Sequence, residues 1–266
     1  MMEPVVRDVD VVTQVGTFGS AETVSETASG QQLFVIDSST TGANLSASVA
    51  AAGANSTVIV QGDFTGVNSR VNLQSGQTLM GKGSITVKSP SGRTATLQTG
   101  AASITGTGGV FSSVSSLINM ANNSSLSGVN VNNLGSGGNG TATILVDGVS
   151  GVTIRANTIR GSASGNTATP IFVEGGSSDI TITDNTLSAT TAGSLLAVGG
   201  AMVNVGNNIN FSNNAITATG STDTRALFLR DATNLTGSGN TRGGLPCNTS
   251  GTNSGAISFT DGGTCP

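Results

Sequence analysis

A repeated apolar strand with an asparagine turn constrains the fold of this chain more than any other sequence feature. The segment VTIRANTI (residues 152–159) recurs as ITITDNTL (180–187) and INFSNNAI (209–216), with a decayed copy at 235–242 and a shortened copy at 129–134. The aligned asparagines are Asn133, Asn157, Asn185, Asn214 and Asn240, spaced by 24, 28, 29 and 26 residues. Repeats of this length without a 3.6-residue apolar period are typical of a solenoid.

Stacking of the repeats explains why asparagine recurs. One unit cannot bury its own apolar face, whereas stacked units bury it and place equivalent residues roughly 4.8 Å apart. Asparagine tolerates left-handed backbone angles and bonds nearby main-chain groups, so it suits a corner of the coil. We therefore expect Asn157, Asn185 and Asn214 to stack at one corner with their side chains inward.

A second apolar strand follows each asparagine turn. These strands are Ile144–Val146, Ile171–Val173, Leu196–Val198, Leu227–Leu229 and Ile257–Phe259. Within the strands apolar and polar residues alternate with period two, and only a short stretch around Ala43 to Ala54 indicates a helix. Loops rich in Ser, Thr, Gly and Asn fall at the same point of each repeat, and the pattern predicts an all-β solenoid.

The segment VNLQSGQTLMGKGSITV (residues 71–87) is similar to a phosphate-binding loop, but it lacks the residue and the helix that such a loop requires. Gly83 stands where the Ser or Thr after the lysine should be, and a β pattern follows instead of a helix. Its core, SGQTLMGKG (75–83), resembles the S-N-x-T-I-x-G-x-G turn-and-strand element of pectate lyases and their relatives. The repeats after residue 126 are also similar to that superfamily.

This resemblance implies a right-handed parallel β-helix, for which we expect about nine coils at about 25 residues each. Residues 1–33 would form an N-terminal entry or cap segment, residues 34–242 the β-helix, and residues 243–266 a C-terminal coil and disulfide cap. The resemblance does not carry over the catalytic site. The R-x-P-x-x-R element of pectate lyases is absent, since Ala168 stands where its first arginine would precede Pro170, and the chain has no His or Trp.

Two acidic residues take equivalent positions in neighbouring coils. Asp147 and Glu174 each follow the last residue of a second strand, so stacking would place two like charges about 5 Å apart. Such a pair could bind calcium or share a proton, and they are the weak metal candidates of the chain; the alternative is a solvated corner that tolerates charge. No cofactor-binding or catalytic residue is assigned.

Composition and cysteine usage indicate which partners and which cellular compartment to expect. Only 9% of the 266 residues are charged, the net charge is −4, and no basic stripe exists, so nucleic acid is not an expected partner. No apolar run reaches a transmembrane length, and the first residues carry no signal-peptide pattern. Cys247 and Cys265 lie close together, and a disulfide between them favours an oxidising compartment.

These observations lead to two functional hypotheses. The first is a secreted or cell-surface structural or adhesive protein without catalytic machinery, which binds a polysaccharide or a host surface ligand. The alternative is a polysaccharide-active enzyme, a lyase or endoglycosidase, that uses surface carboxylates. A monomer is favoured over a head-to-tail assembly, in which the strand-like residues 5–18 would pair with an exposed edge of a neighbour.

Overall fold

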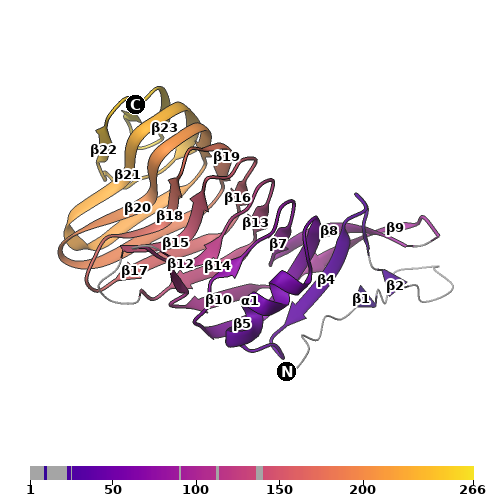
Figure 1. Ribbon diagram of the computed structural model, residues 1–266. Helices are drawn as coiled ribbons and strands as arrows, with labels where there is room; N and C mark the ends of the chain where they lie inside the picture. The colour runs from indigo at the N-terminus through magenta and orange to yellow at the C-terminus, as the bar shows by residue number, and fades with distance from the viewer. Residues whose placement is uncertain (1–8, 11–22, 25, 90, 112–113, 136–139) are drawn as a thin grey trace.

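The computed structural model describes residues 9–10, 23–24, 26–89, 91–111, 114–135 and 140–266. They form a parallel β-helix of about seven turns, which is the expected fold class with fewer coils than the expected nine. The coils stack from the N-terminal end at the lower right of Figure 1 to the C-terminal end at the upper left. The count is lower because regular coils repeat every 26 to 29 residues and because an inserted hairpin adds residues without adding a coil.

Three parallel sheets, here named I, II and III, form the sides of the solenoid. Sheet I contains the end of β5 (Ser56–Val67), β10 (Ala102–Gly106), β14 (Val129–Asn133), β17 (Thr158–Ala163) and the starts of β20 (Thr186–Ser212) and β21 (Ala215–Asn240). Sheet II contains β6 (Val71–Asn72), β12 (Val114–Asn119), β15 (Gly140–Asp147), β18 (Ala168–Glu174), the middle of β20 and β21, and β22 (Cys247–Ser250). Sheet III contains β4 (Gln32–Asp37), the start of β5, β7 (Thr78–Met80), β13 (Ser125–Ser127), β16 (Thr153–Arg155), β19 (Ser177–Thr183), the later parts of β20 and β21, and β23 (Gly255–Phe259).

Shorter elements surround these sheets. The antiparallel partners are β1 (Val9–Asp10) with β2 (Thr23–Val24), β3 (Glu26–Thr27) with β4 and β8 (Gly83–Lys88), β8 with β9 (Thr94–Thr99), β11 (Gly109–Phe111) with β12, and β23 with β24 (Thr264–Cys265). The helix α1 (Gly42–Ala51) lies near the N-terminal end of the solenoid and buries Leu45 and Val49 in its core, at the place where a short helix was expected.

The core is built from inward rows of aliphatic side chains that stack from coil to coil. In sheet I one such row consists of Ile104, Val131, Ile159, Leu187 and Ile216, all of them buried. Full burial of each side chain stabilises the fold by about 1.5–3 kcal/mol before the cost of ordering the chain is counted. Period-two alternation within each strand therefore separates this core from the polar outer faces.

Buried asparagines form a hydrogen-bonded ladder at the corner between sheets III and I. The Oδ1 atom of Asn185 accepts from the main-chain N–H of Asn157, the Oδ1 of Asn214 accepts from that of Asn185, and the Oδ1 of Asn240 accepts from that of Asn214, over 2.9–3.0 Å. Each side-chain amide donates to a main-chain carbonyl and, between neighbours in the ladder, to the next Oδ1. The buried hydrogen-bonding groups of this corner thus find their partners within the protein.

Asn133 does not belong to this ladder. Its register partner is Gly161, and the residue that bonds the Oδ1 of Asn157 from the preceding coil is Val129, through its main-chain N–H. The shortened copy is thus aligned four residues away from the expected position. Asn133 is still buried, where its side chain bonds the Ala142 carbonyl and the Gly135 N–H across the sheet I to sheet II connection.

Two of the second strands also differ from expectation. Ile171–Val173 pairs with Ala201–Val203 rather than with Leu196–Val198, because additional residues in β20 shift the register. Leu227–Leu229 pairs with β22, whereas Ile257–Phe259 lies beside Gly237–Asn240, next to the ladder corner. The pairing of Ile171–Val173 with Ala201–Val203 determines which residues of β20 lie beside Glu174 on the outer face of sheet II.

The N-terminal part contains a small second core that sequence periodicity does not reveal. The segment after Gly81 continues as β8, a strand and not a helix, which excludes a phosphate loop. The β8–β9 hairpin packs over the outer side of β4, β5 and β7, and its Val87 is buried against Leu33, Ile59 and Met80. Most of residues 1–33, including most of the strand-like segment 5–18, lie outside the described residues.

The C-terminal end is tied to the solenoid by the expected disulfide. Cys247 in β22 and Cys265 in β24 are bonded, and Cys265 is buried in the core. Arg242 lies over the ring of Phe259, 4.5 Å from the ring centroid, and forms an ion pair with Asp261. Among the described residues, no helix is long and apolar enough to cross a membrane.

Candidate functional site

The two acidic residues singled out in the sequence are direct neighbours on the outer face of sheet II. Asp147 ends β15 and Glu174 ends β18, and the two strands pair in register at these residues. Adjacent parallel strands lie about 4.8 Å apart, so the two carboxyl groups project side by side. Asp147 is exposed and Glu174 is partly buried.

The carboxylate of Asp147 lies close to the backbone that follows β18. Gly175 has a φ of 67°, a conformation that glycine adopts readily. A Cβ atom at Gly175 would collide with Oδ1 of Asp147 and with the main chain of Gly148. The side chain of Asp147 therefore leans over the next coil, toward the strand end that carries Glu174.

Burial and a neighbouring charge both act on Glu174. The pKa of Glu174 is raised above its usual value, first because burial disfavours the charged form and second because Asp147 repels it. The pair therefore has unequal environments, one exposed and one partly buried. Carboxyl groups in unequal environments are the usual basis for separate acid and base roles.

The row continues with an amide and an arginine. If Leu196–Val198 were the second strand, Gly199 would come next in this row. Because of the register shift, Asn204 takes that position instead, and Arg230 follows it on β21. The Nε atom of Arg230 donates to the Oδ1 of Asn204 over 2.8 Å. Glu174, Asn204 and Arg230 thus present an acid, an amide and a cation at successive coils. Sequence reasoning missed Asn204, since two apolar segments of β20 compete for the same register.

An apolar row runs beside the charged row on the same face. Two residues before Asp147, Glu174, Asn204 and Arg230 stand Leu145, Phe172, Met202 and Phe228, which are paired in register. Phe172, Met202 and Phe228 face outward and are partly exposed. Flat apolar side chains beside hydrogen-bonding groups match the two kinds of surface of a sugar ring, one of C–H bonds and one of hydroxyls.

Val205 borders this face in a backbone conformation that valine rarely adopts. Its φ is 60°, and its side chain is 49% exposed. The equivalent corner positions in other coils are occupied by Gly148, Gly175, Asp231 and Gly251. A β-branched residue at positive φ is strained, and backbone strain tends to concentrate at functional sites. The conformation of Val205 therefore favours a functional site at this end of sheet II.

The metal hypothesis for Asp147 and Glu174 has less support in this geometry than proton sharing. Calcium takes six to eight oxygen ligands, and the described residues bring together no group of three or more His, Cys, Asp or Glu side chains. The arrangement is that of a carboxylate pair flanked by an amide and an arginine.

Comparison with known proteins does not assign the chain to a family. No protein-family model matches it, and no curated protein sequence matches it. Two crystal structures are similar to it. One is a proposed glycosyl hydrolase from Parabacteroides merdae, with 10% identity, a TM-score of 0.43, and 81% of this chain and 97% of that chain covered. The other is an alginate lyase from a Paenibacillus species, with 12% identity, a TM-score of 0.40, and 86% and 96% covered.

The expectation of a structural or adhesive protein without catalytic machinery is corrected by these comparisons. One of the two similar structures is described as a glycosyl hydrolase and the other as an alginate lyase, and neither is described as a structural or adhesive protein. At fold level the parallel β-helix also agrees with the resemblance to pectate lyases. At such low identities the likeness is one of fold, so the activity has to be inferred from the residues on sheet II.

Proposed function

We propose that the chain is a secreted polysaccharide-active enzyme that hydrolyses glycosidic bonds on the outer face of sheet II. The observation that carries this proposal is the in-register pair of Asp147 and Glu174, in which Glu174 has a raised pKa. Glycoside hydrolysis needs two carboxyl groups, one protonated and one ionised. The register brings two carboxyl groups to one place, and the raised pKa favours Glu174 as the one that donates a proton.

The roles follow from the environments. Glu174, whose protonated form is favoured, donates its proton to the glycosidic oxygen as the bond to the anomeric carbon breaks. The exposed carboxylate of Asp147 stabilises or attacks the positively charged anomeric carbon. Water then adds to that carbon and returns a proton to Glu174. Neighbouring strands about 4.8 Å apart suit the close carboxylate spacing of retaining enzymes, roughly 5–5.5 Å.

The rest of the face would orient the polysaccharide. The partly exposed Phe172 and Phe228 stand on either side of Met202, two strand spacings or about 9.6 Å apart. This separation is close to the length of a disaccharide unit in an extended β-1,4-linked chain, so a glycan lying along the solenoid axis could stack on both rings. Asn204 and Arg230 lie beside this path and can bond hydroxyl or carboxylate groups.

Secretion is part of the proposal. Disulfides persist mainly in oxidising compartments, and the bond between Cys247 and Cys265 suits a protein that acts outside the cell. Extracellular polysaccharide is also where an enzyme of this kind would meet its substrate.

The test is a cleavage assay with matched variants. The protein is incubated with a panel of neutral and acidic polysaccharides, and both new reducing ends and ultraviolet absorbance are followed. We expect new reducing ends without an unsaturated, absorbing product. Glu174→Gln and Asp147→Asn should each abolish cleavage, whereas Asp184→Asn, an exposed carboxylate at the other corner of the coil, should not.

Two results would contradict the proposal. One is full activity in both Glu174→Gln and Asp147→Asn, which would place the chemistry elsewhere. The other is product absorbance that rises in step with reducing ends, which would indicate elimination by a lyase. Circular dichroism of each variant shows whether lost activity reflects lost chemistry or lost fold.

A further inference from the structure

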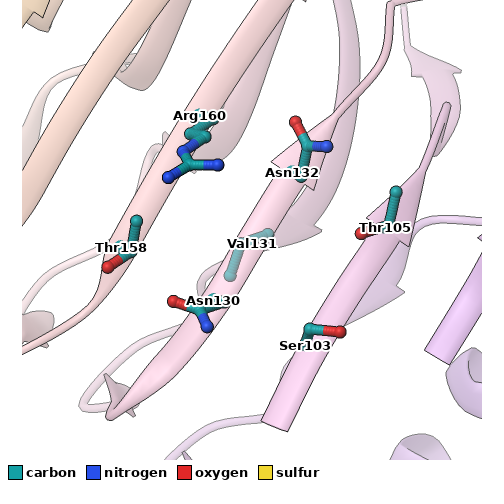
Figure 2. Close-up of a pocket in the computed structure, with 7 residues that line it drawn as sticks. All are labelled: Ser103, Thr105, Asn130, Val131, Asn132, Thr158 and Arg160. Carbon is teal, nitrogen blue, oxygen red and sulfur yellow. The ribbon is translucent and has the colours of Figure 1, made fainter. Parts of the chain in front are cut away.

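A polar groove lies on the outer face of sheet I, away from the carboxylate pair. Its volume is about 290 Å³, and it is lined by Ser103, Thr105, Asn130, Val131, Asn132, Thr158 and Arg160. Figure 2 shows these residues on three neighbouring strands, β10, β14 and β17. The register arranges the outward side chains in two rows, Ser103–Asn130–Thr158 and Thr105–Asn132–Arg160. The groove therefore spans three coils along the solenoid axis.

Three of the polar side chains that line the groove, Asn130, Asn132 and Arg160, have no partner among the described residues. Within the described part of the chain, neither the guanidinium of Arg160 nor the side-chain amides of Asn130 and Asn132 form a hydrogen bond or an ion pair. By contrast, Arg230 is bonded to Asn204, and Arg242 is bonded to the Gly262 carbonyl. Donors left open across a concave surface are available to a ligand.

The charge distribution indicates the chemistry of that ligand. Arg160 is the cation of the groove, and it stands in the same row as the amide of Asn132. Guanidinium and amide donors together match a carboxylate or sulfate group, which arginine can bind through two parallel hydrogen bonds. At the opposite edge, Asp63 accepts a hydrogen bond from Ser103, so a second anion is disfavoured there. The groove thus suits a ligand that carries one acidic group and several hydroxyls.

Acidic sugars fit this description better than other anions do. A nucleic acid would need several cations and aromatic rings for its bases, and this groove provides one arginine and no aromatic side chain. Asn130, Thr158 and Ser103 offer alternating donors and acceptors at the spacing of neighbouring strands, which is suitable for sugar hydroxyls.

We propose that the groove on sheet I is a second, non-catalytic glycan site that binds an acidic sugar unit, with its carboxylate or sulfate on Arg160 and Asn132. Its ligand class rests on the proposed function, because a polysaccharide held on sheet I would be kept near the carboxylate pair of sheet II. Its binding, however, does not depend on that pair.

Binding is measured by isothermal titration calorimetry on the full chain, with oligogalacturonate, its methyl-esterified neutral form and a sulfated galactan oligosaccharide. We expect at least one of the two acidic probes to bind more tightly than the neutral one. Arg160→Ala should weaken that binding by roughly tenfold or more, the usual loss for a charge-assisted contact. Arg155→Ala removes an exposed arginine of the same coil on sheet III and should change nothing.

A binding measurement in Glu174→Gln separates the two proposals. If acidic probes bind this variant as tightly as the wild type and lose affinity in Arg160→Ala, the second site stands, whether or not any polymer is cleaved. If neither acidic probe binds, or if Arg160→Ala and Arg155→Ala bind alike, the second site is ruled out even where cleavage is observed. The carboxylate and sulfate probes distinguish the two sources of the acidic group.

Discussion

The asparagine ladder allows the sharpest test of how this fold is stabilised. In the middle of the ladder, Asn185 accepts hydrogen bonds from the main-chain N–H and the side-chain amide of Asn157, over 3.0 and 3.1 Å. Its own amide donates to the carbonyl of Ile154 and to the Oδ1 of Asn214, both over 3.0 Å. Asn185→Leu keeps a similar side-chain volume and removes all four bonds.

The expected loss can be estimated from these contacts. The buried N–H of Asn157 loses its acceptor, which costs about 1–3 kcal/mol, and each of the other three bonds contributes about 0.5–1.5 kcal/mol. Burial of the leucine side chain offsets part of this loss. We therefore expect the free energy of unfolding to fall by roughly 2–5 kcal/mol. Urea denaturation followed by circular dichroism, with the disulfide intact, measures the change.

A matched control separates burial from hydrogen bonding. Asn207 also accepts two hydrogen bonds from the next coil, from Thr233 and Asn234, but its side chain is exposed. Asn207→Ala should change the free energy of unfolding by no more than about 0.5 kcal/mol, because water replaces the lost partners. Equal losses in Asn185→Leu and Asn207→Ala would refute the argument that burial gives the ladder its importance.

Three further predictions concern the carboxylate face and the C-terminal cap. Because the pKa of Glu174 is raised, its contribution to stability is present at low pH and lost as pH rises through that pKa. Glu174→Gln should therefore melt at a higher temperature than the wild type at neutral pH, but not below about pH 4. Identical dependence of the melting temperature on pH in the two proteins would oppose this. Val205→Gly should raise the free energy of unfolding by about 1 kcal/mol, since glycine adopts a positive φ without strain. A variant that is less stable than the wild type in urea denaturation would count against strain at this position. Replacement of Cys247 and Cys265 by serine should lower the free energy of unfolding by about 3 kcal/mol, as expected for a cross-link across a separation of 18 residues, and an unchanged urea midpoint would contradict it.

Inward-facing residues could be predicted from the sequence because the fold requires the same residue at the same offset in every coil. Asn157, Asn185, Asn214 and Asn240 each follow a residue with a positive φ, and their side chains bond equivalent groups of the neighbouring coil. The shortened copy misled the alignment at Asn133, since a run of V, N and N fits the pattern at more than one offset. Repetition therefore predicts the ladder but not its first member.

Register within the long strand β20 could not be predicted from the pattern of apolar residues. Both Leu196–Val198 and Ala201–Val203 have the required alternation, and only pairing with β18 distinguishes them. The consequence is functional, because the choice places Asn204 rather than Gly199 between Glu174 and Arg230. The β8–β9 hairpin escaped prediction for a related reason, since its apolar residues pack on the outside of the solenoid and not in its core.

The groove on sheet I could not have been found from the sequence. Its side chains, such as Ser103, Asn130 and Thr158, have the ordinary polar character of an outward strand position. They share a row only because their strands pair in register. No repeated residue type marks the row, and hydrophobic periodicity reports only that each residue faces outward.

The same difference between inward and outward positions supports a functional reading of the carboxylate pair. The fold does not require acids at these positions, since Asn204 and Ser250 occupy equivalent places in later coils. Burial first, and the neighbouring Asp147 second, disfavour the charged form of Glu174 and raise its pKa. A solenoid that can vary its outer residues freely would avoid such a pair if stability alone mattered. Function is therefore the better explanation for two carboxylates in register.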